Sequence, residues 1–348
     1  MSNDNLYTKT LPKLFMILVA YSVFFTFLIC MHNLREWAKP RRQTVRAERH
    51  LLDLTPLNKD NRFRSKFDGH WIFLLETSGR GMLDSRHVCS LEALAKANPN
   101  VTIFLVMPCP VRVINLEDNV ALARLLDSCE SVQLATLDAK KILKDLPLEN
   151  ISQTEILQSN TYKQRTSDLL RLALIWTFGG TYMDLDVITL RNLSPLLQTE
   201  NFLAAESSSS INSFVMKFRK GHPLVMKLME RVRESYQPVD NSTAPWAFSS
   251  AVANTFNISV QEAIARGNVS DVQIFNSSVF SPVKYGDFED VFDDSKSILA
   301  DKIISGSFGL HFWSKMAKRF QIKPNSTAPF SIIAKQFCPK TFEILASG

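Results

Sequence analysis

The sequence predicts an α/β domain in which helices flank a Rossmann-like, mostly parallel sheet. Short apolar stretches alternate with helical ones between residues 71 and 146, an alternation typical of doubly wound folds. Val101–Met107 is a continuous apolar run, as expected for a strand buried on both faces. A largely apolar helix at 169–178 then passes through a Gly-Gly pair into an apolar strand at 181–190. We expect this helix and this strand to lie at the centre of the sheet.

The elements are expected in the following order. Trp71–Leu75 is a strand that runs into polar residues, as at the carboxyl end of a first parallel strand, where ligands bind. Periodicity and turn residues predict helices at 87–97, 120–126, 139–146, 169–178 (capped by Thr166 or Ser167), 224–234 and 246–256. Further strands are expected at 101–107, 131–137, 181–190, 202–205, 211–218 and 307–313. Residues 257–295 are expected to be rich in loops with short strands, and the residues after 313 to form a Lys-rich tail.

An uncharged apolar run, Leu14–Met31, precedes the domain and is just long enough to cross a bilayer. It ends in large residues rather than in the small ones of a signal-peptide cleavage site, so we expect an uncleaved anchor. The predicted organisation is a cytoplasmic tail at 1–13, a transmembrane anchor at 14–31, a stem at 32–69 and a lumenal domain at 70–348. Basic residues after the run favour the opposite orientation by the positive-inside rule, so other signals must decide.

Glycosylation sequons supply one such signal. The pattern N-x-S/T occurs eight times, which suggests a secretory lumen. The asparagines are Asn100, Asn150, Asn192, Asn241, Asn257, Asn268, Asn276 and Asn325. Four cysteines outside the anchor permit two disulfides in any of three pairings, or four buried thiols. These are Cys89, Cys109, Cys129 and Cys338.

The composition indicates a folded protein that does not bind nucleic acid. Apolar residues make up 45% of the 348 residues, which is enough for a core. The formal net charge is +6, but no basic stripe interleaved with aromatic side chains is present. The absence of a C-x-x-C pair argues against a zinc site.

Two carboxylates, Asp184 and Asp186, lie at positions i and i+2 of the strand expected at 181–190. Strand side chains alternate between faces, so both carboxylates should point the same way. Like charges side by side in an apolar element are unfavourable, and a bound cation relieves them. Oxygen ligands suit Mn²⁺ or Mg²⁺, whose remaining positions are commonly filled by water and substrate phosphates. The pattern therefore indicates a nucleoside diphosphate ligand, with the metal neutralising the departing diphosphate.

Three further side chains are candidates for ligand contact. Asp168 and Arg171 are three residues apart, so they share one face of the apolar helix that leads into this strand. One interpretation is an internal ion pair. In the other, sugar hydroxyls and phosphate oxygens complete the hydrogen bonds of the pair, with Arg171 binding bidentately. Asn212, in the strand at 211–218, is either a further polar contact or an ordinary strand residue.

The segment S-D-L-L-R-x-A-L-x-W-x-F-G-G-T-Y-M-D-L-D at 167–186 resembles the family of Golgi α1,4-galactosyltransferases and α1,4-N-acetylglucosaminyltransferases. The resemblance spans roughly residues 70–340 and is nearest to proteins of the animal lactosylceramide α1,4-galactosyltransferase type, including the insect α1,4-N-acetylgalactosaminyltransferases. Other matching segments are FLLETSGR at 73–80, VCSLEALAKANPN at 88–100, LHFWSK at 310–315 and FCP at 337–339.

This resemblance implies a GT-A fold and a single-pass, type II Golgi membrane enzyme. The implied donor is a UDP-sugar, the cofactor is Mn²⁺ (or Mg²⁺), and the anomeric configuration is retained. The implied catalytic residues are Asp184, Asp186, Asp168 and Arg171. The implied metal ligands are Asp184, Asp186 and His311, although a lone His in an apolar strand is also typical of a core. The implied donor-binding residues are Glu76, Thr77, Ser78, Asp168, Arg171, Tyr182, Asn212 and Trp313, of which Tyr182 is equally compatible with a core position.

The resemblance leaves the acceptor open. The family usually has Gly-Pro ahead of the helix expected at 246–256, whereas this chain has Ala244-Pro245, and Ala does not adopt positive φ as Gly does. We expect transfer of galactose or N-acetylgalactosamine in α1,4 linkage to a terminal sugar of a glycolipid or other glycan. The alternative is a weakly active or inactive, membrane-anchored, glycan-binding member of the fold. A phosphatase of the D-x-D-x-T type is disfavoured because residue 188 is Ile.

Overall fold

The structure is a computed structural model, and it describes residues 48–50, 52–53, 71–79, 81–108, 113–116, 119–151, 162–235 and 243–347. The predicted cytoplasmic tail and anchor, and most of the predicted stem, lie outside these residues and stay predictions. Within the described ranges, no helix combines the length and the apolar character needed to cross a membrane.

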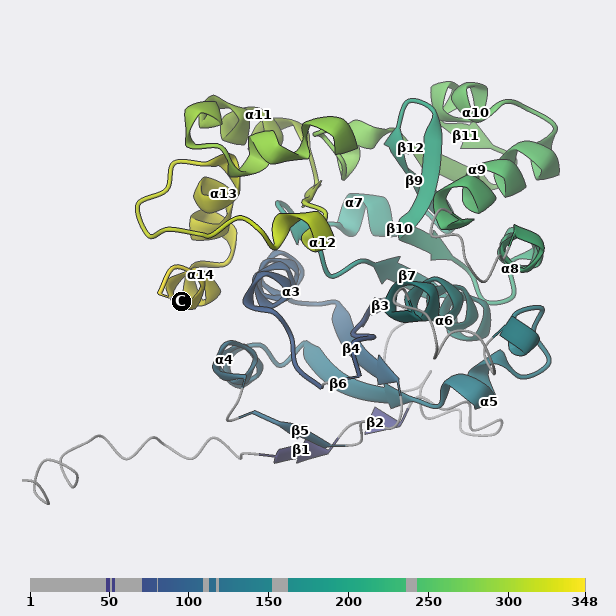
Figure 1. Ribbon diagram of the computed structural model, residues 1–348. Helices are drawn as coiled ribbons and strands as arrows, with labels where there is room; N and C mark the ends of the chain where they lie inside the picture. Colours follow the sequence, from purple (N-terminus) through teal and green to yellow (C-terminus); the bar gives the residue numbers. More distant parts are fainter. Residues whose placement is uncertain are drawn as a thin grey trace, which may run out of the picture. The chain divides into compact units, whose positions relative to one another are not determined.

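A nine-stranded sheet forms the frame of the fold (Figure 1). Its strands, in order across the sheet, are β11 (Asn268–Val269), β12 (Val272–Phe275), β9 (Phe202–Ser207), β10 (Ser210–Phe218), β7 (Gly180–Met183), β3 (Trp71–Leu75), β4 (Thr102–Pro108), β6 (Val132–Leu137) and β2 (Leu52–Asp53). The strands from β7 to β2 are parallel, whereas β10 is antiparallel to both of its neighbours. The predicted mostly parallel α/β sheet is confirmed, and β7 lies at its centre. β2 lies within residues that we assigned to the stem, and it extends the sheet beside β6.

Apolar strands and apolar helices pack to form this frame. Every residue of β3 is buried, and its alternate residues Trp71, Phe73 and Leu75 belong to one large core cluster. The same cluster contains side chains of α5 (Ala139–Leu143), α6 (Tyr162–Phe178), α8 (Pro223–Ser235) and α9 (Thr243–Phe256). Each fully buried Leu or Phe side chain contributes about 1.5–3 kcal/mol. Ala244 lies in the first turn of α9, a conformation that Ala adopts readily.

The strand predicted at 181–190 is in fact two strands separated by a turn. β7 stays in the main sheet, whereas β8 (Val187–Thr189) leaves it to pair antiparallel with β13 (Gly309–His311). The turn forms at 184–186, where the Val187 N–H bonds to the Asp184 carbonyl at 3.3 Å. The prediction of one strand was wrong because β8 is as apolar as β7, so residue pattern alone does not reveal the change of sheet.

Helix α6 differs from the prediction at its start, because it begins at Tyr162 and not after a cap at Thr166 or Ser167. Its end is as predicted. Gly179 and Gly180 have φ values of 72° and 93°, left-handed values that favour glycine. Packing also requires Gly180, since a Cβ there would clash with the indole of Trp71. That indole donates a hydrogen bond to the Gly179 carbonyl at 3.0 Å.

A helical layer forms the carboxyl-terminal part of the domain, and most of it lies in residues that we predicted to be a tail. It consists of α11 (Ile298–Gly306), α12 (Ser314–Ala317), α13 (Pro329–Phe337) and α14 (Pro339–Leu345), and α10 (Val260–Arg266) precedes it. Side chains of this layer form a second core cluster with β8, β13 and α3 (Ser85–Ala97). The prediction of a tail was wrong because the helices after residue 313 are short, with nine residues or fewer, and such lengths are hard to recognise from the sequence. Residues 257–295 contain the short strands β11 and β12, as expected, and α10 in addition.

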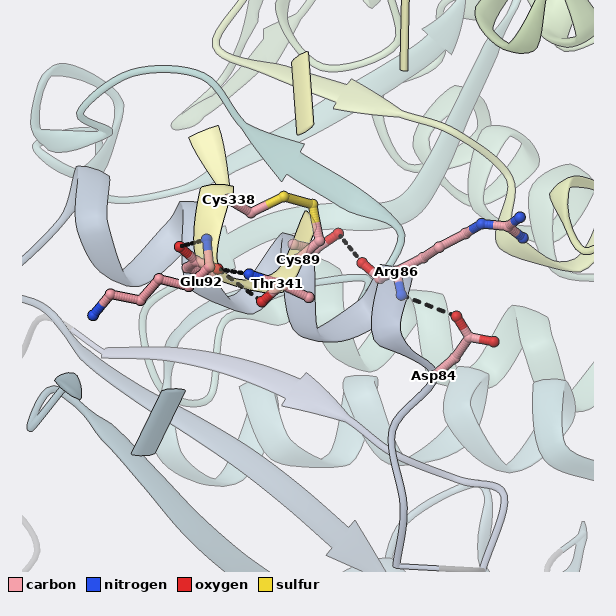
Figure 2. Close-up of a disulfide and its surroundings, with 8 residues drawn as sticks. Asp84, Arg86, Cys89, Glu92, Cys338 and Thr341 are labelled. Carbon is pink, nitrogen blue, oxygen red and sulfur yellow. Dashed lines mark hydrogen bonds between the residues drawn. A yellow bond between two sulfur atoms is a disulfide. The ribbon is translucent and has the colours of Figure 1, made fainter. Parts of the chain in front are cut away.

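A disulfide attaches this layer to α3 (Figure 2). Cys89 in α3 is bonded to Cys338, which lies between α13 and α14. Beside the disulfide, the buried Glu92 carboxylate accepts hydrogen bonds from the Thr341 N–H at 2.8 Å and the Thr341 hydroxyl at 2.7 Å. Glu92 therefore binds the amino end of α14. The Cys129 thiol is free, and Cys109 lies outside the described residues.

Candidate active site

The predicted site residues lie beyond one end of the central strands. Parallel pairing of β3 with β7 sets Phe73 opposite Tyr182, so the residues that follow the two strands come side by side. Glu76 follows β3, and Asp184 follows β7. In open α/β sheets, ligands bind in this position, beyond the carboxyl ends of parallel strands.

Asp184, Asp186 and His311 form one group at this edge. One oxygen of each carboxylate and one imidazole nitrogen lie within 4.8 Å of one another. We expected both carboxylates on one face of a strand, but they converge because the chain turns between β7 and β8. β13 pairs with β8 so that His311 lies opposite Val187, which places the imidazole beside the turn.

Asp184 is held by residues close to it in the sequence. Its Oδ1 accepts a hydrogen bond from the Tyr182 hydroxyl at 2.6 Å and lies 3.2 Å from Nη1 of Arg171. Burial raises the pKa of the Asp184 carboxyl, with Asp186 adding to the rise and Arg171 opposing it. An additional cation beside Asp184 would therefore stabilise its charged form.

All three nitrogens of the Arg171 guanidinium contact protein partners. Nε bonds to the Ser167 carbonyl at 3.2 Å, Nη2 to the Ser167 hydroxyl at 2.9 Å and Nη1 to the Ser213 hydroxyl at 2.8 Å. Nη2 also lies 3.1 Å from Asp168, so the ion pair considered from the sequence is present. Burial lowers the pKa of Arg171, but Asp184 and the other carboxylates outweigh it, and the side chain stays charged. Arg171 thus connects α6 to β10 and orients Asp184. The predicted contact of Arg171 with a sugar donor stays a prediction.

Asp186 is held by residues of the distant carboxyl-terminal layer. Its Oδ2 accepts a hydrogen bond from the Ser314 N–H at 2.8 Å, and its Oδ1 lies 3.3 Å from Nε2 of His311. Burial raises the pKa of Asp186, but His311 and the Ser314 N–H outweigh burial and bring it below its usual range. Burial has the opposite effect on His311 and lowers the pKa of its imidazole. The nearby Asp186 carboxylate outweighs this effect of burial, so the pKa of His311 lies above its usual range.

Stacking fixes the ring of His311. Its centroid lies 4.7 Å from that of Phe214 and 4.8 Å from that of Trp313. Its Nδ1 is buried and has no hydrogen-bond partner among the described residues. The ring nitrogen that faces the carboxylates is Nε2, which lies 3.3 Å from Oδ1 of Asp186. Two carboxylate oxygens and one imidazole nitrogen can together hold a divalent cation.

Sequence reasoning missed two residues of the site, His87 and Ser314. His87 lies in the first turn of α3, and its Nε2 is 2.7 Å from the Ser314 hydroxyl, while the Ser314 N–H bonds to Asp186. Burial lowers the pKa of His87, although Asp186 and Asp84 act in the opposite direction, so the imidazole is neutral at neutral pH. The two residues are 227 positions apart, and no local pattern links them.

The predicted residues at the end of β3 border the group. Glu76 is buried, and its Oε1 accepts a hydrogen bond from the Ser78 N–H at 2.7 Å. Its Oε2 has no hydrogen-bond partner within the part of the chain that the structure describes. Thr77 is half-buried beside it. A buried, unpartnered carboxylate oxygen at a ligand-binding edge is an acceptor suited to a ligand hydroxyl.

The other predicted donor residues differ in how accessible they are. Tyr182 is 1% exposed, so it packs in the core while its hydroxyl orients Asp184. Asn212, in β10, is half-buried, and its Oδ1 accepts a hydrogen bond from the Ser213 N–H at 2.7 Å. Trp313 is buried with a left-handed φ of 47°, and its indole N–H bonds to Glu206 at 3.4 Å.

Two family models match the chain. Residues 84–203 match a glycosyltransferase sugar-binding region containing a DXD motif, and residues 217–345 match an α1,4-glycosyltransferase conserved region. The first match contains Asp184 and Asp186, and the second contains His311. Each match therefore contributes part of the same group of side chains.

Curated relatives and solved structures also resemble the chain. Human lactosylceramide 4-alpha-galactosyltransferase is 26% identical over 79% of this chain and 77% of its own length. Human alpha-1,4-N-acetylglucosaminyltransferase is 29% identical over 80% of this chain and 81% of its own length. Among solved structures, the PaToxG glycosyltransferase has a TM-score of 0.42 and 16% identity, covering 54% of this chain and 68% of that one. The galactosyltransferase LgtC with donor and acceptor sugar analogues has a TM-score of 0.38 and 11% identity, covering 78% and 95%.

Proposed function

We propose that this chain is a UDP-sugar glycosyltransferase of the DXD-containing α1,4-glycosyltransferase family. The sugar that it transfers is galactose or N-acetylgalactosamine, and the acceptor is a terminal sugar of a glycolipid. The new linkage is α1,4, and the donor's anomeric configuration is retained. The observation that carries the proposal is the convergence of Asp184, Asp186 and His311 beyond the carboxyl end of β7. A relative named for lactosylceramide supports a glycolipid acceptor.

The metal that we assign to this group is Mn²⁺, with Mg²⁺ as the alternative. Asp184, Asp186 and His311 would hold it, and a mixed oxygen and nitrogen set suits Mn²⁺ better than Mg²⁺, which prefers oxygen ligands. When bound, the cation neutralises charge that develops on the departing diphosphate. Arg171 keeps Asp184 directed into the group, and the Ser314 N–H does the same for Asp186.

We assign donor binding to the side chains around this group. Glu76, with Thr77 and Ser78, would contact the nucleoside, because its Oε2 is buried and unpartnered among the described residues. The Asp168 side chain is 21% exposed, so a sugar hydroxyl can reach its carboxylate while it remains paired with Arg171. The remaining donor contacts in this assignment are Arg171, Tyr182, Asn212 and Trp313.

The proposed setting is the Golgi membrane, with a GT-A-type catalytic domain in the lumen. The anchor at 14–31 and the sequons support this placement. The Cys89–Cys338 disulfide agrees with it, because disulfides persist in oxidising compartments.

The test is transfer by the full-length chain in detergent micelles. Lactosylceramide is supplied with UDP-galactose, UDP-N-acetylgalactosamine or UDP-N-acetylglucosamine, in Mn²⁺, in Mg²⁺ or with EDTA. We expect UDP release and an α1,4-linked product with one of the first two donors, in Mn²⁺ and not with EDTA. Glycolipid binding without metal-dependent product from any donor would overturn the proposal in favour of a glycan-binding protein.

A further inference from the structure

Aromatic rings connect the Asp184–Asp186–His311 group to the molecular surface. The Trp313 ring lies 4.8 Å from the His311 ring and also meets the Tyr285 ring edge-on at 5.9 Å. Trp313 is 7% exposed, whereas Tyr285 is 55% exposed. Tyr285 begins the 3₁₀ segment η4 (Tyr285–Phe292), and its ring also stacks on the buried Phe288 at 6.2 Å. An exposed ring is thus held in place two ring contacts from a proposed metal ligand.

We propose that Tyr285, together with Glu206, forms the subsite for the acceptor's terminal sugar. This inference rests on the proposed function, because it names the residues that seat the second substrate of that reaction. A hexose presents one face of C–H groups and a rim of hydroxyls. Tyr285 offers a flat apolar surface for the C–H face, and Glu206 offers a carboxylate for the hydroxyls.

Glu206 contacts the same indole that Tyr285 contacts. It is near the end of β9 and half-buried, and its Oε1 accepts the Trp313 indole N–H at 3.4 Å. A carboxylate has about four lone-pair sites, so a single indole N–H leaves capacity for a sugar hydroxyl.

Trp313, which contacts His311, Tyr285 and Glu206, is fixed by its own backbone. Its φ of 47° is unusual for a non-glycine residue, and such conformations persist where the surrounding structure enforces them. The Met316 and Ala317 N–H groups bond to its carbonyl at 2.9 and 3.0 Å, which starts α12 directly after it. The indole is therefore held in a fixed position in which it contacts the His311 ring, the Tyr285 ring and the Glu206 carboxylate.

Among the described residues, the other half-exposed large aromatic side chain is Trp246, at 56%. It belongs to α9, and the Arg231 guanidinium lies 4.5 Å over its ring. Its described ring contact is with that arginine and not with the rings that lead to His311. Trp246 is therefore the alternative aromatic side chain on which an acceptor sugar could stack, and the test includes a variant of it.

The test measures acceptor KM, donor KM and kcat for Tyr285→Ala, Tyr285→Phe and Trp246→Ala in the full chain with lactosylceramide. Ile298→Ala is the matched control, because Ile298 is 73% exposed and lies in α11. We expect Tyr285→Ala to raise acceptor KM about tenfold, as loss of one aromatic stacking contact implies. Tyr285→Phe keeps the ring and should stay within about twofold of the wild type. Glu206→Gln, which keeps an oxygen for the indole, should raise acceptor KM less than Tyr285→Ala.

An unchanged acceptor KM in Tyr285→Ala would overturn the inference, as would an equal rise in Ile298→Ala. A rise confined to Trp246→Ala would place the acceptor on α9 and overturn it too. Wild-type transfer in the same assay separates these results from failure of the proposed function. If the wild type forms no metal-dependent product, the proposed function fails; if it does and Tyr285→Ala is normal, only the acceptor subsite fails.

Discussion

Asp184 and Asp186 are two residues apart, yet different parts of the chain hold them. Asp184 is bound by Tyr182 and Arg171, which are 2 and 13 positions away. Asp186 is bound by Ser314, which is 128 positions away, and by His311 beside it. The local region of α6, β7 and β10 therefore orients one carboxylate, and the distant region of β13 and α12 orients the other. The group is complete only when the carboxyl-terminal layer packs against the sheet.

The two regions also shift the two carboxyl groups in opposite directions. Burial raises the pKa of Asp184, whereas His311 and the Ser314 N–H bring the pKa of Asp186 below its usual range. Asp186 is therefore charged without help from a metal, while Asp184 depends on Arg171 and would gain from a bound cation.

The largest effect on transfer is expected from Asp186→Asn, which removes the charge of the carboxylate that the distant region orients. Transfer should fall about a thousand-fold, because loss of a proposed metal ligand is expected to cost about 4 kcal/mol of transition-state stabilisation. Asn keeps an oxygen for the Ser314 N–H, so the Tm should stay near that of the wild type. Metal-dependent UDP release and thermal unfolding measure the two quantities. Undiminished turnover would exclude Asp186 as a metal ligand.

The next effect tests the local region through Arg171. Arg171→Met leaves the mostly buried carboxylates of Asp168 and Asp184 without their cation, so the free energy of unfolding should fall by about 3 kcal/mol. Arg171→Lys keeps the charge but loses the planar five-donor fork, and should lie between the wild type and Arg171→Met. Denaturant unfolding in the absence of metal measures both variants. Wild-type stability of Arg171→Met would contradict the role of Arg171 in holding this region.

A smaller loss is expected where the distant region is attached to α3. The double variant Cys89→Ala, Cys338→Ala should lose about 2 kcal/mol of unfolding free energy, because removing the cross-link frees the unfolded chain. The Glu92–Thr341 contacts remain and limit the loss. Cys129→Ala is the control, since its thiol is free. Equal stability of the double variant and the control would show that packing alone attaches the layer.

The smallest effect is a pH dependence of stability, which we expect from His87 through its contact with Ser314 of the distant region. Burial lowers the pKa of His87, so below about pH 6.5 the unfolded chain binds more protons than the folded one. The contribution of His87 to stability is thus fully present above the unfolded pKa and is lost as the pH falls below it. His87→Gln keeps a hydrogen-bonding group for Ser314 but removes the titration.

Thermal unfolding of metal-free wild type and His87→Gln at several pH values from about 5 to about 7.5 measures this dependence. The Tm of the wild type relative to the variant should rise with pH. His311 titrates in both proteins, so its opposite effect cancels in the difference. A difference that is flat or falls with pH would contradict a lowered pKa of His87 in the folded protein.

The sequence by itself determined the parallel sheet, its central strand and the position of the two carboxylates. Continuous apolar runs such as Val101–Met107, the Gly179-Gly180 stop and the D-x-D spacing all act through nearby residues, so they can be recognised locally. The Asp168–Arg171 ion pair was one of two interpretations for the same reason, since three positions on a helix share a face.

Only the tertiary structure decided how the group is completed. It turned the chain between Asp184 and Asp186, folded the predicted tail into helices, and brought Ser314 and His87 to the Asp186 side. It also chose Cys338 as the partner of Cys89, 249 positions away. Such contacts depend on how whole elements pack against one another, and residue spacing within a single element does not carry that information.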